Sequence, residues 1–321
     1  MKRCCIIYNE PGVEAHADEL DVLDQVEHIG VHLSGLGIEV SKKGITANFM
    51  TEIAELAGQK YDLVFNLVES INNKGELNYF IPALLNMYSI PYSGNPLEAI
   101  FTTSNKTLAG SMMRNAGIKN PASFKPSLAG FLKEGTKYII KPVWEDGSLG
   151  ITGDSVFESG KGDKEKLKGF DDAHWFIEEY IEGREFNISI LSGPDGPEVL
   201  PPAEILFVNF NDNRPKIVDF KAKWEPDSFE YINTVRKFPG DTLSSKLHTG
   251  LKKTAVECWN LFGLKGYARV DIRTDKNEDV YVIEVNANPC ISPDSGFVAA
   301  VGEAGYSFTS VIQRIVDDLN N

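Results

Sequence analysis

The sequence predicts an α/β protein with more than one subdomain and an open parallel sheet in its N-terminal part. The chain has 321 residues, of which 42% are hydrophobic, so a sizeable core is available. In residues 1–99, apolar strand-like runs alternate with segments of helical spacing, which is typical of a parallel sheet covered by helices. Longer strands with fewer helices follow in residues 100–185 and 186–321, and they indicate two further α+β subdomains.

The N-terminal part contains clear strand and helix signals. Apolar residues recur at helical spacing from Asp18 to Leu36, and Gly37 then provides a suitable C-terminal cap. No glycine fingerprint of the dinucleotide-binding type follows the first strand, so NAD binding is not expected. The expected elements are strands at Arg3–Asn9, Ile38–Val40 and Tyr61–Val68 and helices at Asp18–Leu36 and Tyr79–Met87.

The remainder of the chain is expected to alternate long strands with a few helices. The expected helices are Thr102–Gly117, which carries Lys106, then Thr242–Phe262 and Phe308–Leu319. The expected strands are Lys137–Val143, Trp175–Ile181, Glu185–Leu191, Val199–Ile205, Lys216–Trp224, Tyr267–Thr274 and Val280–Asn286.

Charge and cysteine usage restrict the classes of partner and compartment. Lys+Arg 32 against Asp+Glu 46 gives a net charge of -14, which argues against nucleic acid or an anionic membrane as partner. A bound nucleotide would need local lysines and metal ions, because the overall field opposes it. The cysteines Cys4, Cys5, Cys258 and Cys290 form no CxxC pattern and are expected to be reduced thiols in a cytoplasmic protein. No signal peptide or membrane span is expected.

Two strands near the C-terminus carry the residues most suggestive of chemistry. Successive side chains of a strand point to opposite faces, so Glu284 and Asn286 share a face, as do Arg269 and Asp271 on the preceding strand. Carboxylate and carboxamide oxygens suit Mg²⁺, and an arginine beside such ions indicates phosphoryl transfer. An amphipathic hairpin with a solvated polar face has the same spacing, and spacing alone does not separate the two interpretations.

Other segments could bind a nucleotide. Lys141 lies at the tip of an apolar strand, where its ammonium group needs an anion. The loop that follows, residues 145–150, offers glycine backbone amides and the Ser148 hydroxyl to phosphate oxygens. The acidic residues after the strand near Glu178 could accept hydrogen bonds from adenine and ribose. Taken singly, these segments are equally consistent with a hairpin connection and an exposed strand edge.

In this order along the chain, the motifs resemble the ATP-grasp superfamily and specifically the D-alanine–D-alanine ligase family. The motifs are the Lys141-Pro142 strand end with its small-residue loop, Glu178-Glu179-Tyr180-Ile181, Ala222-Lys223, the Ala-Arg-Val-Asp of 268–271, and Glu284-x-Asn286. The resemblance implies an ATP-grasp fold, in which a preATP-grasp domain and two α+β subdomains clasp ATP. It also implies a cytoplasmic ATP-dependent carboxylate–amine ligase that works through an acyl phosphate, with D-alanine–D-alanine formation for cell-wall peptidoglycan as the expected reaction.

The resemblance implies a role for each matching residue. ATP and Mg²⁺ (two ions, with Mn²⁺ as a substitute) would be the cofactors, amino acids the substrates, and a homodimer a common assembly. The implied ATP contacts are Lys106, Lys141 and Lys223 on the phosphates, Ser148 in the closing loop, Glu178 on the adenine amine, Glu179, Tyr180 and Ile181 as hinge, and Glu185 on the ribose. The implied metal ligands are Asp271, Glu284 and Asn286, and Arg269 would steady the acyl phosphate. Glu19 would orient the first substrate's amine, Ser295 the second substrate's carboxylate, and a backbone amide near Cys290 the oxyanion.

The sequence departs from the family pattern around the amino-acid pocket. Val68-Glu69 lies where the family usually has His-Gly, Gly147 replaces a serine, Trp224 replaces a tyrosine and Cys290 replaces a glycine. These departures keep two alternatives open, namely a ligase for other amino acids or peptides and a small-molecule kinase on the same scaffold.

Overall fold

The N-terminal sheet is parallel, as predicted. The structure is a computed structural model that describes residues 1–160, 162–211 and 213–319. Strand β1 (Arg3–Asn9) lies between β2 (Glu39–Ile45) and β3 (Leu63–Leu67) and pairs with both in parallel. Its residues from Cys4 to Ile7 are fully buried, because helices cover both faces of the sheet. These helices are α1 (Ala17–Gly35), α2 (Phe49–Gly58) and α3 (Phe80–Met87).

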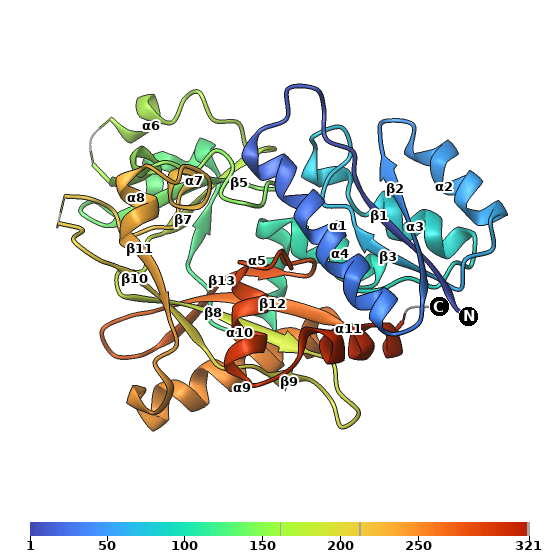
Figure 1. Cartoon of the computed structure of the whole chain (residues 1–321). Helices are drawn as coiled ribbons and strands as arrows, with labels where there is room; N and C mark the ends of the chain where they lie inside the picture. Colours follow the sequence, from blue (N-terminus) through green and yellow to red (C-terminus); the bar gives the residue numbers. More distant parts are fainter. Residues whose placement is uncertain (161, 212, 320–321) are drawn as a thin grey trace.

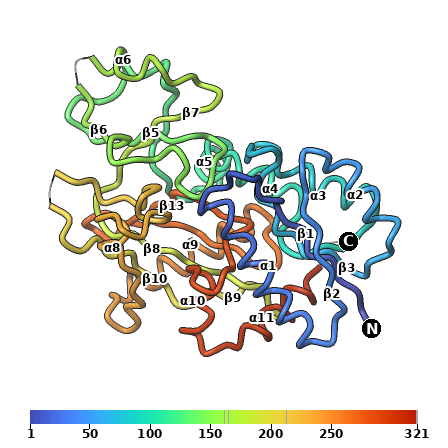
Figure 2. The backbone as a smooth tube through the Cα atoms, turned by 45° about the horizontal axis from the view of Figure 1, so that its top comes forward, coloured from blue at the N-terminus to red at the C-terminus, as the bar shows by residue number. Residues whose placement is uncertain are grey.

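The middle of the chain forms an antiparallel sheet in the order β4–β7–β5–β6. Its strands are β4 (Ser123–Phe124), β5 (Lys137–Pro142), β6 (Val156–Glu158) and β7 (Trp175–Glu179), and α6 (Asp163–Lys166) lies beside them. A small core of its own, which includes Tyr138, Ile140 and Ile177, holds this lobe together. Figure 2 shows the lobe projecting from the rest of the molecule.

A larger antiparallel sheet, in the order β11–β10–β8–β12–β13 with β9 on β8, forms the C-terminal part. Its strands are β8 (Arg184–Leu191), β9 (Glu198–Val199), β10 (Ala203–Phe207), β11 (Thr234–Lys237), β12 (Tyr267–Thr274) and β13 (Val280–Asn286). The helices around it are α4 (Leu97–Ser104), α5 (Lys106–Asn115), α7 (Phe220–Trp224), α8 (Phe229–Asn233), α9 (Ser245–Phe262), α10 (Gly296–Glu303) and α11 (Phe308–Asp317).

The N-terminal and C-terminal parts share one apolar core. Ile29 and Leu33 of α1 pack in the same buried cluster as Ile312 and Ile315 of α11, and Figure 1 shows these two helices side by side. Asn95 adds a polar link, because its amide donates to the Tyr267 carbonyl at 2.8 Å and its oxygen accepts from the Lys265 amide at 2.7 Å. The two parts therefore form a common base, above which the middle lobe is held by a separate core.

Three sequence predictions of elements were wrong in part. The helix expected at Thr102–Gly117 is split into α4 and α5, because Asn105 leaves the helical conformation (φ -87, ψ 97) and caps α5 through the Leu108 amide at 2.9 Å. The strand expected at Lys216–Trp224 ends in helix α7 instead, which starts where Asp219 accepts from the Ala222 amide at 2.9 Å.

The third correction concerns the strand expected at Val199–Ile205, which is interrupted between β9 and β10. Pro201 and Pro202 lie in the gap, and proline has no N–H to donate to a ladder. In the described part of the chain, no helix is both long enough and apolar enough to cross a bilayer.

Candidate functional site

A deep cleft of about 1330 Å³ lies where the three sheets face one another. It is lined by the ends of β1 and β3, the start of α1, the loop after β5, helix α7 and one face of β8, β12 and β13. Its volume exceeds the 300–1,000 Å³ typical of a site for one small molecule, so it has room for a nucleotide together with smaller substrates.

Strands β12 and β13 bring the predicted metal ligands onto one face. Their register sets Arg269 opposite Asn286 and Asp271 opposite Glu284. The Arg269 guanidinium holds Asp271 with two hydrogen bonds, Nε to Oδ1 at 2.7 Å and Nη2 to Oδ2 at 2.8 Å. Asn286 donates to Asp271 Oδ2 at 3.1 Å, and Asn187 of β8 donates to Oδ1 at 2.8 Å. The sequence did not single out Asn187, which orients this carboxylate from a third strand.

Lys106 neutralises the remaining carboxylate of this face. Its Nζ lies 3.0 Å from Glu284 Oε1 and 2.8 Å from Asp146 Oδ1. Burial favours the neutral form of Glu284, but the cations of Lys106, Lys223 and Arg269 outweigh it and lower the pKa of Glu284. The carboxylate is therefore ionised at neutral pH and available to a cation.

The donor set of this face fits a hard divalent ion. Asp271, Glu284 and Asn286 offer carboxylate and amide oxygens from adjacent strands, which is the ligand chemistry that Mg²⁺ prefers. Within the residues described, no cluster of three or more His, Cys, Asp or Glu side chains is arranged to hold a metal ion. A metal here would thus depend on the Asn286 oxygen and on phosphate oxygens as further ligands.

The strands β5 and β7 pair a lysine with a buried glutamate. Lys141 Nζ lies 2.6 Å from Glu178 Oε2, and both side chains are largely buried. Burial raises the pKa of Glu178, and the attraction of Lys141 opposes that rise. The structure therefore joins two residues to which the sequence gave separate contacts, one to phosphate and the other to adenine.

The segment after β7 continues this end of the cleft. Glu179, Tyr180 and Ile181 all line the cleft, as predicted for a hinge. The Tyr180 hydroxyl donates to the Lys216 carbonyl at 3.1 Å, and the Arg273 guanidinium stacks over its ring at 4.7 Å.

The other predicted residue of this end, Glu185, is buried on β8. Its Oε2 lies 3.6 Å from Arg273 Nη1. Burial raises the pKa of Glu185 and the charge of Arg273 opposes the rise.

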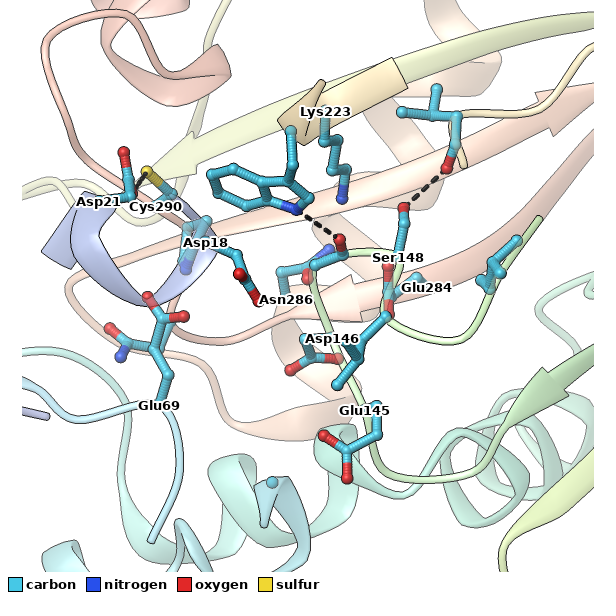
Figure 3. Close-up of a pocket in the computed structure, with 18 of the residues that line it drawn as sticks. Asp18, Asp21, Glu69, Glu145, Asp146, Ser148, Lys223, Glu284, Asn286 and Cys290 are labelled. Atoms are coloured by element: carbon cyan, nitrogen blue, oxygen red, sulfur yellow. Dashed lines mark hydrogen bonds between the residues drawn. The ribbon is translucent and has the colours of Figure 1, made fainter. Parts of the chain in front are cut away.

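The loop of residues 145–150 is fastened across the cleft. Ser148 adopts a left-handed conformation (φ 64), and its hydroxyl donates to the Val218 carbonyl at 2.7 Å. The Trp224 indole N–H donates to the Gly147 carbonyl at 3.0 Å. Beside this clamp, burial and the nearby Arg269 lower the pKa of Lys223, and Glu284 offsets them only in part. Figure 3 shows Lys223, Ser148 and Glu284 together on this side of the cleft.

The predicted substrate residues lie at the other end of the cleft. The Glu19 carboxylate accepts from the His16 amide and from Asn73 Nδ2, both at 2.9 Å, so it caps helix α1. Ser295 caps helix α10 and accepts from the Val298 amide at 3.3 Å. Cys290 donates its S–H to Asp21 Oδ2 at 3.1 Å.

Sequence reasoning missed further cleft residues at this end, namely Asp18, Asp21, Gln25, Glu69 and Arg236. The spacing of Asp18, Asp21 and Gln25 on one side of a helix was the available signal. Arg236, on β11, donates to the Asp294 and Ser295 carbonyls at 3.3 and 3.4 Å, a contact that no local pattern reveals.

Known proteins resemble this chain over most of its length. The family model described as "D-ala D-ala ligase C-terminus" matches residues 132–317. A D-alanine–D-alanine ligase of Moorella thermoacetica is 29% identical over 303 residues, which is 90% of this chain and 91% of that protein. The "Uncharacterized protein y4sG" of Sinorhizobium fredii is 29% identical over 267 residues, 79% of this chain and 74% of that protein.

Solved structures share the fold. A D-alanine–D-alanine ligase from Bacillus anthracis superposes with a TM-score of 0.74 at 20% identity, covering 99% of this chain and 97% of that one. The VanG D-Ala:D-Ser ligase from Enterococcus faecalis gives a TM-score of 0.73 at 19% identity, covering 98% of both chains. The N-terminal parallel sheet and the two antiparallel sheets thus match the ATP-grasp architecture, as the sequence predicted.

Proposed function

This chain belongs to the D-alanine–D-alanine ligase family of ATP-grasp proteins, and on that premise we propose that it joins a carboxylate to an amine through an acyl phosphate. The observation that carries the proposal is the shared face of β12 and β13, where Arg269, Asp271 and Glu284 meet Lys106 and Lys223. Such a concentration of cations and oxygen ligands fits the stabilisation of a phosphoryl group in transfer.

ATP would occupy the end of the cleft between the middle lobe and the β8–β12–β13 sheet, with residues 1–99, 100–185 and 186–321 as the three lobes around it. In this proposal Lys106 and Lys141 contact its phosphates, and residues 178–181 and Glu185 contact adenine and ribose. Asp271, Glu284 and Asn286 hold Mg²⁺, which supplies charge neutralisation for the transferred group.

The chemistry proceeds in two steps in this proposal. A substrate carboxylate oxygen attacks the γ-phosphorus of ATP, the bond from that phosphorus to the ADP oxygen breaks, and an acyl phosphate forms. The amine nitrogen of the second substrate then attacks the acyl carbon, inorganic phosphate leaves with the C–O bond electrons, and the nitrogen loses a proton. Lys223 and Arg269 balance the negative charge in both steps, and the residue 145–150 loop keeps water from the acyl phosphate.

D-Alanine–D-alanine formation is the first candidate reaction, and a ligase for other amino acids is the second. The second is favoured by Glu69, whose carboxylate lies in the cleft where relatives of this family usually have His-Gly.

The test is incubation with ATP, Mg²⁺ and panels of D- and L-amino acids, with ADP, phosphate and amide product measured together. Equal amounts of the three products support the ligase. ADP formed with a stable phosphorylated product and no inorganic phosphate would instead identify a kinase.

A further inference from the structure

The carboxylates that line the cleft fall into two groups. At the nucleotide end each is paired with a cation: Glu284 with Lys106 at 3.0 Å, Asp271 with Arg269 at 2.7 Å, and Glu178 with Lys141, whose Nζ and Oε2 lie 2.6 Å apart. This end of the cleft is therefore balanced in charge without any ligand.

The second group, Asp18, Asp21 and Glu69, lacks such partners. In the part of the chain that the structure describes, none of these carboxylates forms an ion pair with a lysine, arginine or histidine. Asp18 Oδ1 is buried and has no hydrogen-bond partner among the described residues. Figure 3 shows Asp18, Asp21 and Glu69 together on the side of the cleft that faces Lys223. A buried carboxylate oxygen without a donor is costly, so this end calls for a cationic ligand.

Neutral groups hold Asp21 in place. Gln25 Nε2 and the Cys290 thiol both donate to Asp21 Oδ2, at 3.0 and 3.1 Å. Burial, then the charge of Asp21, raises the pKa of Cys290, so it stays a thiol that can donate. Donors without charge orient the carboxylate and leave its negative charge uncompensated.

Glu69 faces the same problem from the end of β3. Burial within the cleft, then the negative charges of Asp146 and Asp21, raise its pKa to about 7, and Gln25 and Lys223 offset this only in part. The side chain itself is accessible from the cleft. A ligand cation between Glu69 and Asp21 would relieve their mutual repulsion.

A metal ion does not explain this group. Within the described residues, no three carboxylates, histidines or cysteines are arranged to hold one. The carboxylates instead border a space that opens towards Lys223 and Arg269, where the substrate carboxyl group would react. The ligand therefore carries its cations at one end and its reactive carboxyl or amine group at the other. One α-ammonium group neutralises one carboxylate and leaves the other two uncompensated.

We propose that one of the two joined substrates is a diamino acid, whose ammonium groups contact Asp18, Asp21 and Glu69. The proposal rests on the ligase reaction proposed above and names its substrate class. Alanine, which carries a single ammonium group, would leave this end of the cleft with excess negative charge.

The test compares kcat/KM for ADP release between basic amino acids and neutral amino acids of the same length. Ornithine and lysine are measured against norvaline and norleucine, with alanine as reference, in both D and L forms. A basic amino acid is expected to have the highest kcat/KM. Asp21→Asn and Glu69→Gln are expected to lower that value by roughly tenfold to a hundredfold, as for the loss of a charged hydrogen bond. Their values for neutral amino acids should change less than about threefold.

The control variant is Asp24→Asn, an exposed carboxylate on the same helix α1 and outside the cleft, which should change neither value. Preference for neutral amino acids, with normal ADP and phosphate release, would overturn the diamino acid and leave the ligase function standing.

If no amino acid stimulates ADP release, the proposed function fails, and a binding measurement decides the remaining inference. Ornithine and norvaline are then titrated calorimetrically into the protein with a non-hydrolysable ATP analogue. Tighter binding of ornithine, weakened in Glu69→Gln, supports a site for a diamino acid. Equal binding of the two overturns it.

Discussion

The clamp between the residue 145–150 loop and helix α7 should determine how well ATP cleavage is coupled to amide formation. Trp224 donates to the Gly147 carbonyl at 3.0 Å and Ser148 donates to the Val218 carbonyl at 2.7 Å. Each neutral hydrogen bond contributes about 1 kcal/mol, which changes the ratio of closed to open loop by about fivefold. Trp224→Phe and Ser148→Ala each remove one of these bonds and keep most of the packing.

An open loop admits water to the acyl phosphate, so the variants should release phosphate without forming amide. The assay is the ratio of phosphate to amide product, measured in the same reaction. We expect uncoupled hydrolysis to rise about fivefold in each variant and by about 25-fold in the double variant if the bonds act independently. Trp259→Phe, in the buried face of α9, is the control and should lower thermal stability without changing the ratio. A double variant that stays fully coupled would refute the clamp.

Three further predictions concern stability and catalysis. Asn95→Ala removes an amide that joins the two parts of the base and should cost about 3 kcal/mol in urea unfolding, since it leaves buried backbone groups without partners; an unchanged midpoint would show that the link carries no load. The pKa of Glu69 rises from 4.5 to about 7 on folding, so stability should fall as pH rises through that window. Glu69→Gln should therefore be more stable than the parent at pH 8 and equal to it at pH 4, by no more than about 1 kcal/mol because the side chain is accessible to water; chemical denaturation at both pH values checks the sign. Arg269→Lys keeps the charge but loses the two-point contact with Asp271, and kcat should fall about a hundredfold with little change in ATP binding; a near-normal kcat would place the reacting groups elsewhere.

The sequence predicted those parts of the site whose geometry is local. Residues two apart on a strand share a face whatever the rest of the fold does, so the arrangement of Arg269 with Asp271 and of Glu284 with Asn286 followed from spacing. The apolar strands β1, β12 and β13 were predicted with their observed bounds, because continuous or alternating hydrophobic runs leave little choice of structure.

The parts that the sequence could not predict depend on distant contacts. Asp21 and Cys290 are 269 positions apart in the chain, and only the packing of α1 against the segment after β13 brings them together. The strand predicted at Lys216–Trp224 had a suitable apolar pattern, but a cap at Asp219 starts a helix there. Pairing of Lys141 with Glu178 likewise needed the register of β5 and β7.

Calorimetric titration of ATP with and without Mg²⁺ tests the central claim most directly. The account predicts that the parent protein binds ATP more tightly with Mg²⁺, and that Asp271→Asn/Glu284→Gln loses this dependence on the metal while remaining folded. Tight ATP binding with an unchanged response to Mg²⁺ in the double variant would contradict the assignment of this face to metal and phosphate.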